Sequence, residues 1–249
     1  MNILLVNDDG IQSDGIQVLY KRLSKEHQVF VLAPDSNRSA VSHHISIFNK
    51  NILKKYDENQ WTCSGFPADC ASIGLTSDLF DIKFDVCISG INAGPNLGTD
   101  IVYSGTCAGA RQAILNKIPG IALSVDPLDW SKPIKYEAMA DFAAKNLENL
   151  MKLVSLEAPR IFVNVNAASL DSYKGVKLGE ELCVRNYMDK IKIENKVDYS
   201  ESHLLPGGGN ETYSPTCDHS IIREGYICVN RVYAEPVCAQ VLEGIAFKL

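Results

Sequence analysis

The chain begins with an apolar run that stops at two adjacent carboxylates, and this junction constrains the fold more than any other stretch. Residues 3–6 have the length and branching of a buried strand, and Gly10 and Gly15 follow where the chain turns into an apparent helix. In open parallel α/β sheets, ligands bind just beyond the carboxyl ends of the strands, which is where Asp8 and Asp9 then lie. Two neighbouring carboxylates repel each other unless a cation lies between them. The junction therefore predicts a divalent metal ion, although a turn with a helix cap would use Asp in the same way.

Strand-like and helix-like segments alternate through about residue 166. The sequence predicts strands at residues 3–6, 28–32, 84–89, 120–125 and 160–165, and helices at residues 16–25, 67–76, 104–116 and 136–155. Such alternation is typical of parallel strands joined by right-handed crossovers. The predicted fold class is therefore α/β, with a doubly wound and mostly parallel sheet.

The other segments depart from this alternation. Residues 40–60 alternate weakly and carry several lysines, which predicts an exposed hairpin, and residues 176–197 predict a second, extended hairpin. Residues 218–232 return to strand character. Because the final third has too little apolar periodicity for a core of its own, we expect a core domain over residues 1–170. Residues 171–249 then form a C-terminal hairpin and tail that packs on this core or on a neighbouring subunit.

Composition excludes several classes of partner. The 249 residues carry a net charge of -6 and give a pI of about 5.4, which argues against binding to polymeric nucleic acid. No stretch approaches the ~20 apolar residues of a membrane span, and no basic region precedes the first apolar run. The eight cysteines are scattered without a Cys-x-x-Cys pair, which argues against a structural zinc site. We therefore expect a cytoplasmic protein without a membrane partner.

Oxygen-bearing side chains follow two further predicted strands. Ser39 lies in the turn-rich segment after the second strand, and Asn92 lies in the glycine-rich loop after the third. Together with Asp8 and Asp9 they supply two carboxylates, a hydroxyl and an amide, which are all hard oxygen donors. Such donors suit Mg²⁺, Mn²⁺ or Ca²⁺ rather than zinc or copper. So few protein ligands leave coordination positions for water or substrate.

A glycine-rich loop at residues 89–103 leads into Ser104, Gly105 and Thr106 at a predicted helix start. Glycines let backbone amides approach an anion, and a helix N-terminus presents unpaired N–H groups, so this surface can cradle phosphate. As a lone pattern, a Ser-Gly-Thr start is more often an ordinary cap. The loop contains neither the Gly-Lys-Ser/Thr of a Walker A motif nor a Gly-x-Gly-x-x-Gly dinucleotide turn.

Four polar residues flank Ser39 and leave two interpretations open. His43 and His44 are adjacent, and either could act as a general acid near neutral pH or could be a solvated loop histidine. Asn37 and Arg38 could bind a substrate phosphate, or Arg38 could face solvent.

Several of these stretches form recognisable motifs. They are Asn7-Asp8-Asp9-Gly10, Ala33-Pro34-Asp35 through Arg38-Ser39, Pro67-Ala68-Asp69-Cys70, the run from Ser89 to Gly98, Tyr103-Ser104-Gly105-Thr106 and Glu224-Gly225-Tyr226. Together they resemble the SurE family, the survival-protein-E nucleotidases. The likeness is dense over residues 1–126 and continues more thinly, in the same order, to about residue 230.

The resemblance implies a Rossmann-like core and a metal-dependent phosphomonoesterase that hydrolyses nucleoside monophosphates to nucleoside and phosphate. It implies a 5′-nucleotidase that also acts on 3′ esters, with one divalent ion, Mg²⁺ or Mn²⁺, or Ca²⁺ in a crystal. It also implies a dimer or tetramer in which C-terminal segments exchange between subunits. The residues carried over are Asp8, Asp9, Ser39 and Asn92 for the metal, and Asn96, Ser104, Gly105 and Thr106 for the phosphate.

The sequence also departs from the pattern of the SurE family. The family usually has Gly where Ala40 stands, Thr where Phe66 stands, Thr-Asp where Cys217-Asp218 stands and Thr-Pro where Asn230-Arg231 stands. These departures leave the predicted metal ligands intact but leave the substrate preference open. Two alternatives therefore remain: an exopolyphosphatase or other phosphatase on the same site, and a nucleotide sensor without catalytic activity.

Overall fold

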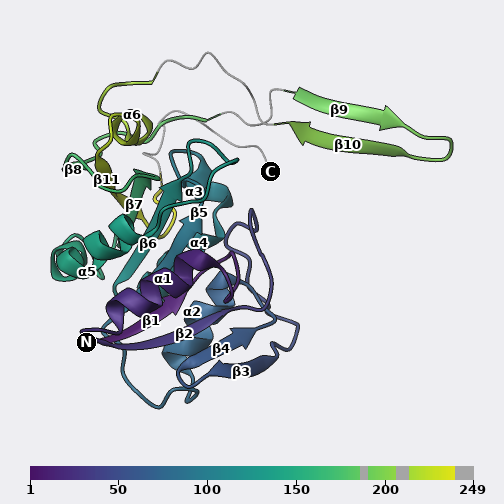
Figure 1. Cartoon of the computed structure of the whole chain (residues 1–249). Helices are drawn as coiled ribbons and strands as arrows, with labels where there is room; N and C mark the ends of the chain where they lie inside the picture. Colours follow the sequence, from purple (N-terminus) through teal and green to yellow (C-terminus); the bar gives the residue numbers. More distant parts are fainter. Residues whose placement is uncertain (186–189, 206–212, 239–249) are drawn as a thin grey trace, which may run out of the picture.

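The computed structural model describes residues 1–185, 190–205 and 213–238, and its body is built on one large sheet. The strands of this sheet are β1 (Asn2–Val6), β2 (Gln28–Pro34), β3 (Leu53–Asp57), β4 (Gln60–Cys63), β5 (Val86–Ala93), β6 (Gly120–Asp126), β7 (Ile161–Ala168), β8 (Val176–Leu178) and β11 (Ile227–Tyr233). They lie in the order β3-β4-β2-β1-β5-β6-β7-β11-β8 (Figure 1). The strands from β4 to β7 in this order pair in parallel, so the predicted α/β class is confirmed.

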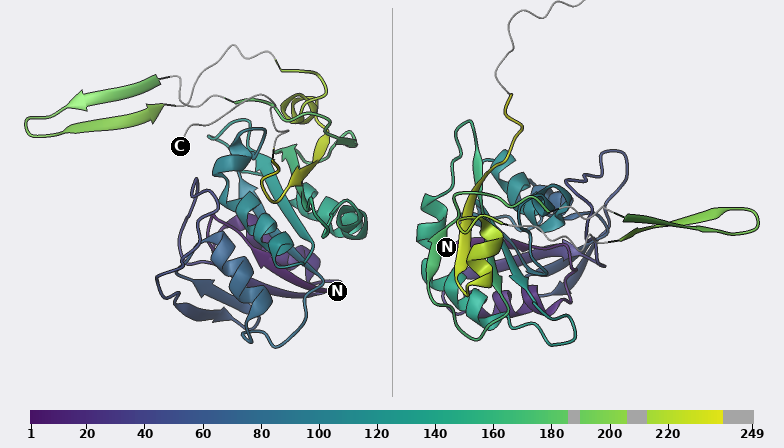
Figure 2. Two further views of the ribbon diagram at one scale, coloured as in Figure 1. Left: turned by 180° about the vertical axis from the view of Figure 1, so that it is seen from behind. Right: turned by 90° about the horizontal axis from the view of Figure 1, so that it is seen from above.

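Helices cover both faces of the sheet. They are α1 (Asp14–Leu23), α2 (Pro67–Thr76), α3 (Asp100–Tyr103), α4 (Gly105–Leu115), α5 (Glu137–Lys152) and α6 (Asp218–Arg223). Helices α1 and α5 pack on one face, and α2 and α4 pack together on the other (Figures 1 and 2). Within the described parts of the chain, no helix has both the length and the apolar character needed to cross a membrane.

Strand β1 lies at the centre of this arrangement. Its side chains alternate between the two faces: Ile3 and Leu5 belong to the core under α1 and α5, whereas Leu4 and Val6 belong to the core under α2. All four are fully buried, and burying each contributes about 1.5–3 kcal/mol. The end of β1 is therefore held firmly, and with it the start of the loop that carries Asp8 and Asp9.

The sheet also has a topological switch point at β1. The chain leaves β1 through α1 and returns to β2 on one side, whereas β5 pairs with β1 on the other side. In open α/β sheets the crevice for ligands lies outside the carboxyl ends of the strands at such a point. Residues 7–15 and the end of β5 meet there.

Two predicted hairpins differ from the observed strands. Within residues 40–60, β3 and the start of β4 do form an antiparallel pair, but β4 also pairs in parallel with β2, so the pair extends the main sheet and β3 is its edge strand. The prediction of one hairpin over residues 176–197 was wrong. Strand β8 instead pairs with the distant β11. The sequence pattern of a strand does not reveal its partner, which is why the prediction failed.

The strand predicted over residues 218–232 was wrong in its first part, where α6 forms. The adjacent Ile221 and Ile222 are both buried in α6. In so short a segment, two consecutive apolar residues fit a buried helix turn as well as a buried strand. Asp218, in the first turn of α6, accepts hydrogen bonds from the backbone N–H groups of Gly98 (2.7 Å) and Cys183 (2.9 Å). These tertiary contacts, rather than local pattern, hold the start of the helix.

A second, two-stranded sheet stands apart from the body. It is the antiparallel hairpin of β9 (Lys190–Asn195) and β10 (Ser200–Leu205), which extends away from the main sheet in every view of Figures 1 and 2. The last part of the predicted C-terminal tail, residues 239–249, lies outside the described residues.

Candidate functional site

A cavity of about 730 Å³ opens at the carboxyl ends of the central strands. The loops after β1, β2, β5 and β6 contribute to it, together with the end of β5, helix α3 and two arginines from the last third of the chain. Five of the predicted site residues lie in its lining, namely Asp8, Ser39, Asn92, Asn96 and Ser104. The cavity is therefore the place where the oxygen donors and the predicted phosphate loop meet.

Asp8 is buried at the mouth of β1. Its Oδ1 accepts a hydrogen bond of 2.6 Å from the hydroxyl of Thr106, and its backbone carbonyl accepts one of 2.7 Å from the Arg38 N–H. Burial, with a further contribution from the charge of Asp9, raises the pKa of Asp8 to about 7, while the Thr106 hydrogen bonds act in the opposite direction. A cation beside these acids would favour their ionised form.

Asp9 lies beside Asp8 but points toward β5. Its Oδ2 accepts a 3.0 Å hydrogen bond from the backbone N–H of Ala93, which itself lines the cavity. Burial raises the pKa of Asp9, and the Ala93 hydrogen bond lowers it. Asp9 itself is not part of the cavity lining, but it is hydrogen-bonded to Ala93, which is.

Ser39 and Asn92 offer the other two oxygens. The backbone N–H of Ser39 donates to the side chain of Asn37 at 2.9 Å, which shapes the turn that presents the Ser39 side chain. The amide nitrogen of Asn92 donates to the carbonyl of Gly94 at 2.9 Å. Because its nitrogen is engaged in this way, the amide oxygen of Asn92 is the atom left for a ligand.

The donor chemistry fits a hard divalent cation. No group of three or more His, Cys, Asp and Glu side chains within the described residues is arranged to hold a metal, so a site here depends on hydroxyl and amide oxygens beside the two acids. The start of α4 lies very close to these acids. A Cβ atom on Gly105 would lie 2.8 Å from Cβ of Asp8, so only glycine fits there.

A chain of hydrogen bonds orients Asp8 from behind. The amide nitrogen of Asn96 donates to the hydroxyls of Ser124 (2.8 Å) and Thr106 (3.3 Å), and the Thr106 hydroxyl donates to Asp8. Both N–H bonds of Asn96 are therefore used inside the protein. Asn96 also lines the cavity, so it supports Thr106 from there, and its predicted contact with phosphate stays a prediction.

Two asparagines on β7, which the sequence analysis did not identify, hold this loop in place. The Asn96 carbonyl accepts from the amides of Asn164 (2.9 Å) and Asn166 (3.1 Å), and its N–H donates to the Asn166 side chain at 2.8 Å. Both asparagines are fully buried. Their signal was available in the sequence, since two polar residues alternate within an otherwise apolar strand.

The helix start behaves as predicted for a cap. The hydroxyl of Ser104 accepts a 2.9 Å hydrogen bond from the N–H of Cys107, which is an ordinary N-cap interaction. Ser104 also lines the cavity. The capping and ligand-facing interpretations of this residue are therefore compatible.

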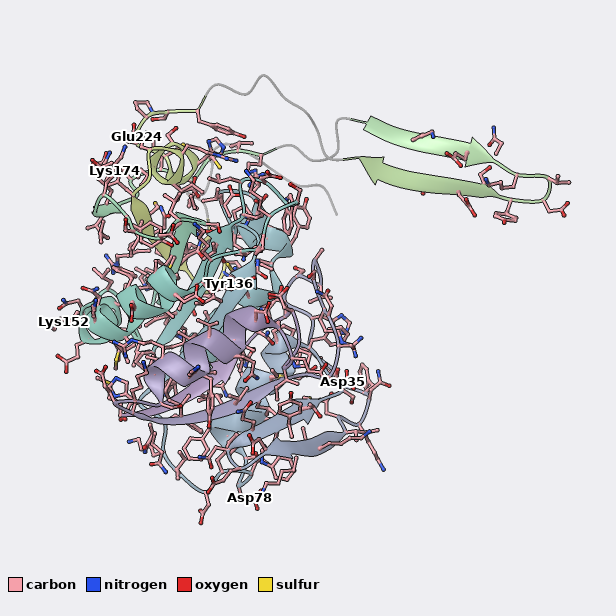
Figure 3. The ribbon with its side chains drawn as sticks, in the orientation of Figure 1. Asp35, Asp78, Tyr136, Lys152, Lys174 and Glu224 are labelled. Carbon is pink, nitrogen blue, oxygen red and sulfur yellow. The ribbon has the colours of Figure 1, made fainter. Side chains whose placement is uncertain are left out.

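Arg38 is drawn away from the cavity. Its guanidinium donates to the Ser64 carbonyl at 3.1 Å and to Asp35 at 3.3 Å, and its Cζ lies 5.6 Å from the centre of the Phe66 ring. Asp35 lies at the outer edge of the body in Figure 3. Asn37 is exposed and is used in the turn before Ser39, and neither Asn37 nor Arg38 belongs to the cavity lining.

The two histidines also lie outside the cavity lining. Nε2 of His43 lies 2.9 Å from Oε1 of Gln112 on α4, and burial lowers the pKa of His43, which favours the neutral ring. His44 packs on Phe66 with 4.0 Å between the ring centres. The phenyl ring of Phe66, where the SurE pattern has Thr, thus contacts both His44 and Arg38.

Ala40 occupies a position that favours glycine. It lines the cavity with a φ of 57°, in the left-handed region that costs an ordinary residue about 1–2 kcal/mol. This agrees with the Gly that the SurE pattern has at the position.

The lining also contains residues that no motif indicated. They are Asp100, Asp126, Leu128, Trp130, Arg185 and Arg223. Two ion pairs lie among them, Arg185 with Asp100 at 2.8 Å and Arg223 with Asp126 at 3.2 Å. Both arginines come from the last third of the chain, so only the folded structure brings them to the cavity.

Comparison with known proteins gives one consistent family. The family model described as "Survival protein SurE" matches residues 3–188. A protein named 5′-nucleotidase SurE from Treponema pallidum is 42% identical over 177 residues, covering 70% of this chain and 93% of its own. Its namesake from Fervidobacterium nodosum is 40% identical over 245 residues, covering 93% of this chain and 91% of its own.

The fold agrees with a solved structure as well. The crystal structure of the SurE protein from Aquifex aeolicus superposes with a TM-score of 0.82 at 29% sequence identity. The match covers 95% of each chain. The likeness therefore extends to the C-terminal third, where sequence motifs are sparse.

The hydrogen bond between Thr106 and Asp8 can be tested through stability. Thr106→Val keeps the size of the side chain but removes the hydroxyl, which leaves a buried Asp8 oxygen without its donor. We expect the free energy of unfolding to fall by about 1–3 kcal/mol in urea denaturation followed by circular dichroism. Thr106→Ser, which keeps the hydroxyl and loses one methyl, should cost only about 0.8 kcal/mol. A Val variant as stable as the unmodified protein would contradict the arrangement.

Proposed function

Because the chain belongs to the SurE family, we propose that it is a metal-dependent phosphomonoesterase that hydrolyses nucleoside monophosphates to nucleoside and phosphate. The relatives of this chain are named 5′-nucleotidases, and these names support 5′-nucleotidase activity for the chain itself. Hydrolysis of 3′ esters and dependence on a metal are the finer parts of the proposal.

One observation carries the metal part of the proposal. Asp8, Ser39 and Asn92 come from the loop after β1, the loop after β2 and the end of β5, and they line the same cavity, next to Asp9 and the start of α4. A turn or helix cap needs only one side-chain oxygen, so capping does not explain why three oxygens from distant segments meet here. Their chemistry is that of a Mg²⁺ or Mn²⁺ site.

The proposed ligands are therefore Asp8, Asp9, Ser39 and Asn92. A divalent ion, when bound, offsets charge on the phosphoryl oxygens and lowers the pKa of a water molecule to supply the nucleophile. The carboxylates of Asp8 and Asp9 would hold the ion, and one of them would accept the proton of the attacking water.

The start of α4 would bind the transferring phosphoryl group. The first N–H groups of a helix lack partners within it and carry a partial positive charge, which suits an anion. Gly105 keeps this end of α4 close to Asp8, and the hydroxyl of Ser104 can donate to a phosphate oxygen while it caps the helix. Asn96 and Thr106 would keep the Asp8 carboxylate in a fixed orientation through their hydrogen bonds.

We also propose that the chain forms a homo-oligomer, a dimer or tetramer with exchanged C-terminal segments. The hairpin of β9 and β10 stands apart from the body, and an isolated two-stranded hairpin is only marginally stable in water. Ile193, Val197 and Tyr199 are exposed large apolar side chains on it. Burial of these side chains against another subunit would stabilise the hairpin.

A cytoplasmic location stays a prediction. It is supported by the eight cysteines, all of which are free and seven of which are buried.

Removal of either acid tests the ligand assignment. We expect Asp8→Asn and Asp9→Asn to lower kcat for AMP hydrolysis at least about 100-fold, since each removes a charge that holds the ion. Phosphate release measures the rate, and a thermal melt checks the fold. Asp78→Asn, at an exposed aspartate on the far edge of the body in Figure 3, is the matched control and should leave the rate unchanged. Normal turnover in either site variant would refute the assignment.

Metal removal tests the cofactor. Excess EDTA should abolish phosphate release from AMP, and added Mg²⁺ or Mn²⁺ should restore it, because the four oxygen ligands suit hard cations. The same assay with inorganic polyphosphate as substrate separates a nucleotidase from a polyphosphatase. Full activity in excess chelator would contradict the metal proposal, and AMP binding without phosphate release would favour the nucleotide sensor.

A further inference from the structure

The loop after β6 presents two large apolar side chains at the edge of the cavity. Leu128 is 45% exposed and Trp130 is 72% exposed, and both belong to the cavity lining. A single exposed apolar residue on a protein surface needs no explanation. An exposed indole and an exposed leucine that both line a cavity are more informative, because a bound ligand can cover both.

The indole of Trp130 lies close to Gly94, two residues after the proposed metal ligand Asn92. A Cβ atom added at Gly94 would lie 3.3 Å from Cη2 of the Trp130 indole. Gly94 has a φ of 123°, and its carbonyl accepts the hydrogen bond from the proposed metal ligand Asn92. The outer edge of the indole therefore rests on the same short loop that would hold the ion, while most of the residue stays open to solvent.

The loop that carries Trp130 is braced by its own hydrogen bonds. The N–H of Leu128 donates to Asp126 at 2.9 Å, on one side of the tryptophan. On the other side, Ser131 donates to Asp129 through its N–H (3.0 Å) and its hydroxyl (2.7 Å). The backbone on both sides of Trp130 is thus ordered before a ligand arrives, which reduces the entropy lost on binding.

The cavity lining has both polar and apolar residues, as a nucleotide has both a charged and an aromatic part. The lining contains the polar Asp8, Asn92 and Ser104, whereas the apolar Leu128 and Trp130 come from a different loop. A volume of about 730 Å³ falls in the range of pockets that enclose a whole small-molecule ligand, well beyond a single phosphoryl group. A nucleoside monophosphate has a charged end and a flat aromatic end, and it matches both.

We propose that Trp130 is the residue that binds the base of the substrate, by stacking, and that it gives the enzyme a preference for purine over pyrimidine nucleotides. The inference rests on the proposed function, because it concerns the same cavity. Stacking on an aromatic side chain accepts every base but is strongest for those with the largest ring surface.

The kinetic test compares Trp130→Ala with Trp130→Phe on AMP, GMP, CMP and ribose 5-phosphate. We expect the Ala variant to raise KM for AMP and GMP about 10-fold or more and that for CMP less, while kcat stays within about 2-fold. Ribose 5-phosphate lacks a base, so its kcat/KM should be the same in all forms. The Phe variant keeps a ring and should restore most of the affinity. An unchanged KM for AMP, or an equal loss with ribose 5-phosphate, would overturn the proposal.

A binding measurement makes this test independent of turnover. The chain has only two tryptophans, Trp61 and Trp130, so Trp61→Phe leaves Trp130 as the sole indole. In this variant AMP should quench the tryptophan emission, and ribose 5-phosphate should not. If AMP quenches the emission but no nucleotide is hydrolysed, the proposed function fails and the assignment of Trp130 stands. If AMP is hydrolysed without any change in emission, the assignment fails and the proposed function stands.

Discussion

The structure depends on the burial of one carboxylate, Asp8, beside a second one, Asp9, at the end of the central strand. Removing a charge from water is costly unless an opposite charge or hydrogen bonds compensate for it. Here the compensation within the chain is partial: Thr106 donates to Asp8, and Ala93 donates to Asp9. In the proposed metal site, a cation from solution would complete this compensation.

The surroundings of Asp8 show how the fold supports such a feature. Alternating side chains of β1 pack into both cores, which holds the strand end in place. Asn96 connects Thr106 to the buried Asn164 and Asn166 on β7, which is separated from β1 by β5 and β6. The carboxylate is therefore oriented by a network that spans the middle of the sheet, and its orientation does not rely on surface loops.

The sequence predicted the parts of the site that follow from strand order, and it failed where distant contacts decide. Asp8, Ser39 and Asn92 reach one cavity because the carboxyl ends of parallel strands share one edge of the sheet. The hydrogen bonds of Asn96 to Ser124 and Thr106 were not predicted, because they join residues that lie far apart in the sequence. Trp130 and the pairing of β8 with β11 depend on loop conformation and on partners far along the chain, which local patterns do not encode. The roles of the metal ligands themselves stay predictions.

The most direct measurement of the central claim is anomalous X-ray diffraction from crystals of the protein grown with Mn²⁺. The account predicts one strong anomalous peak within about 2.0–2.6 Å of carboxylate oxygens from both Asp8 and Asp9, with the oxygens of Ser39 and Asn92 facing the same ion. A peak elsewhere, or no peak at saturating Mn²⁺, would contradict it.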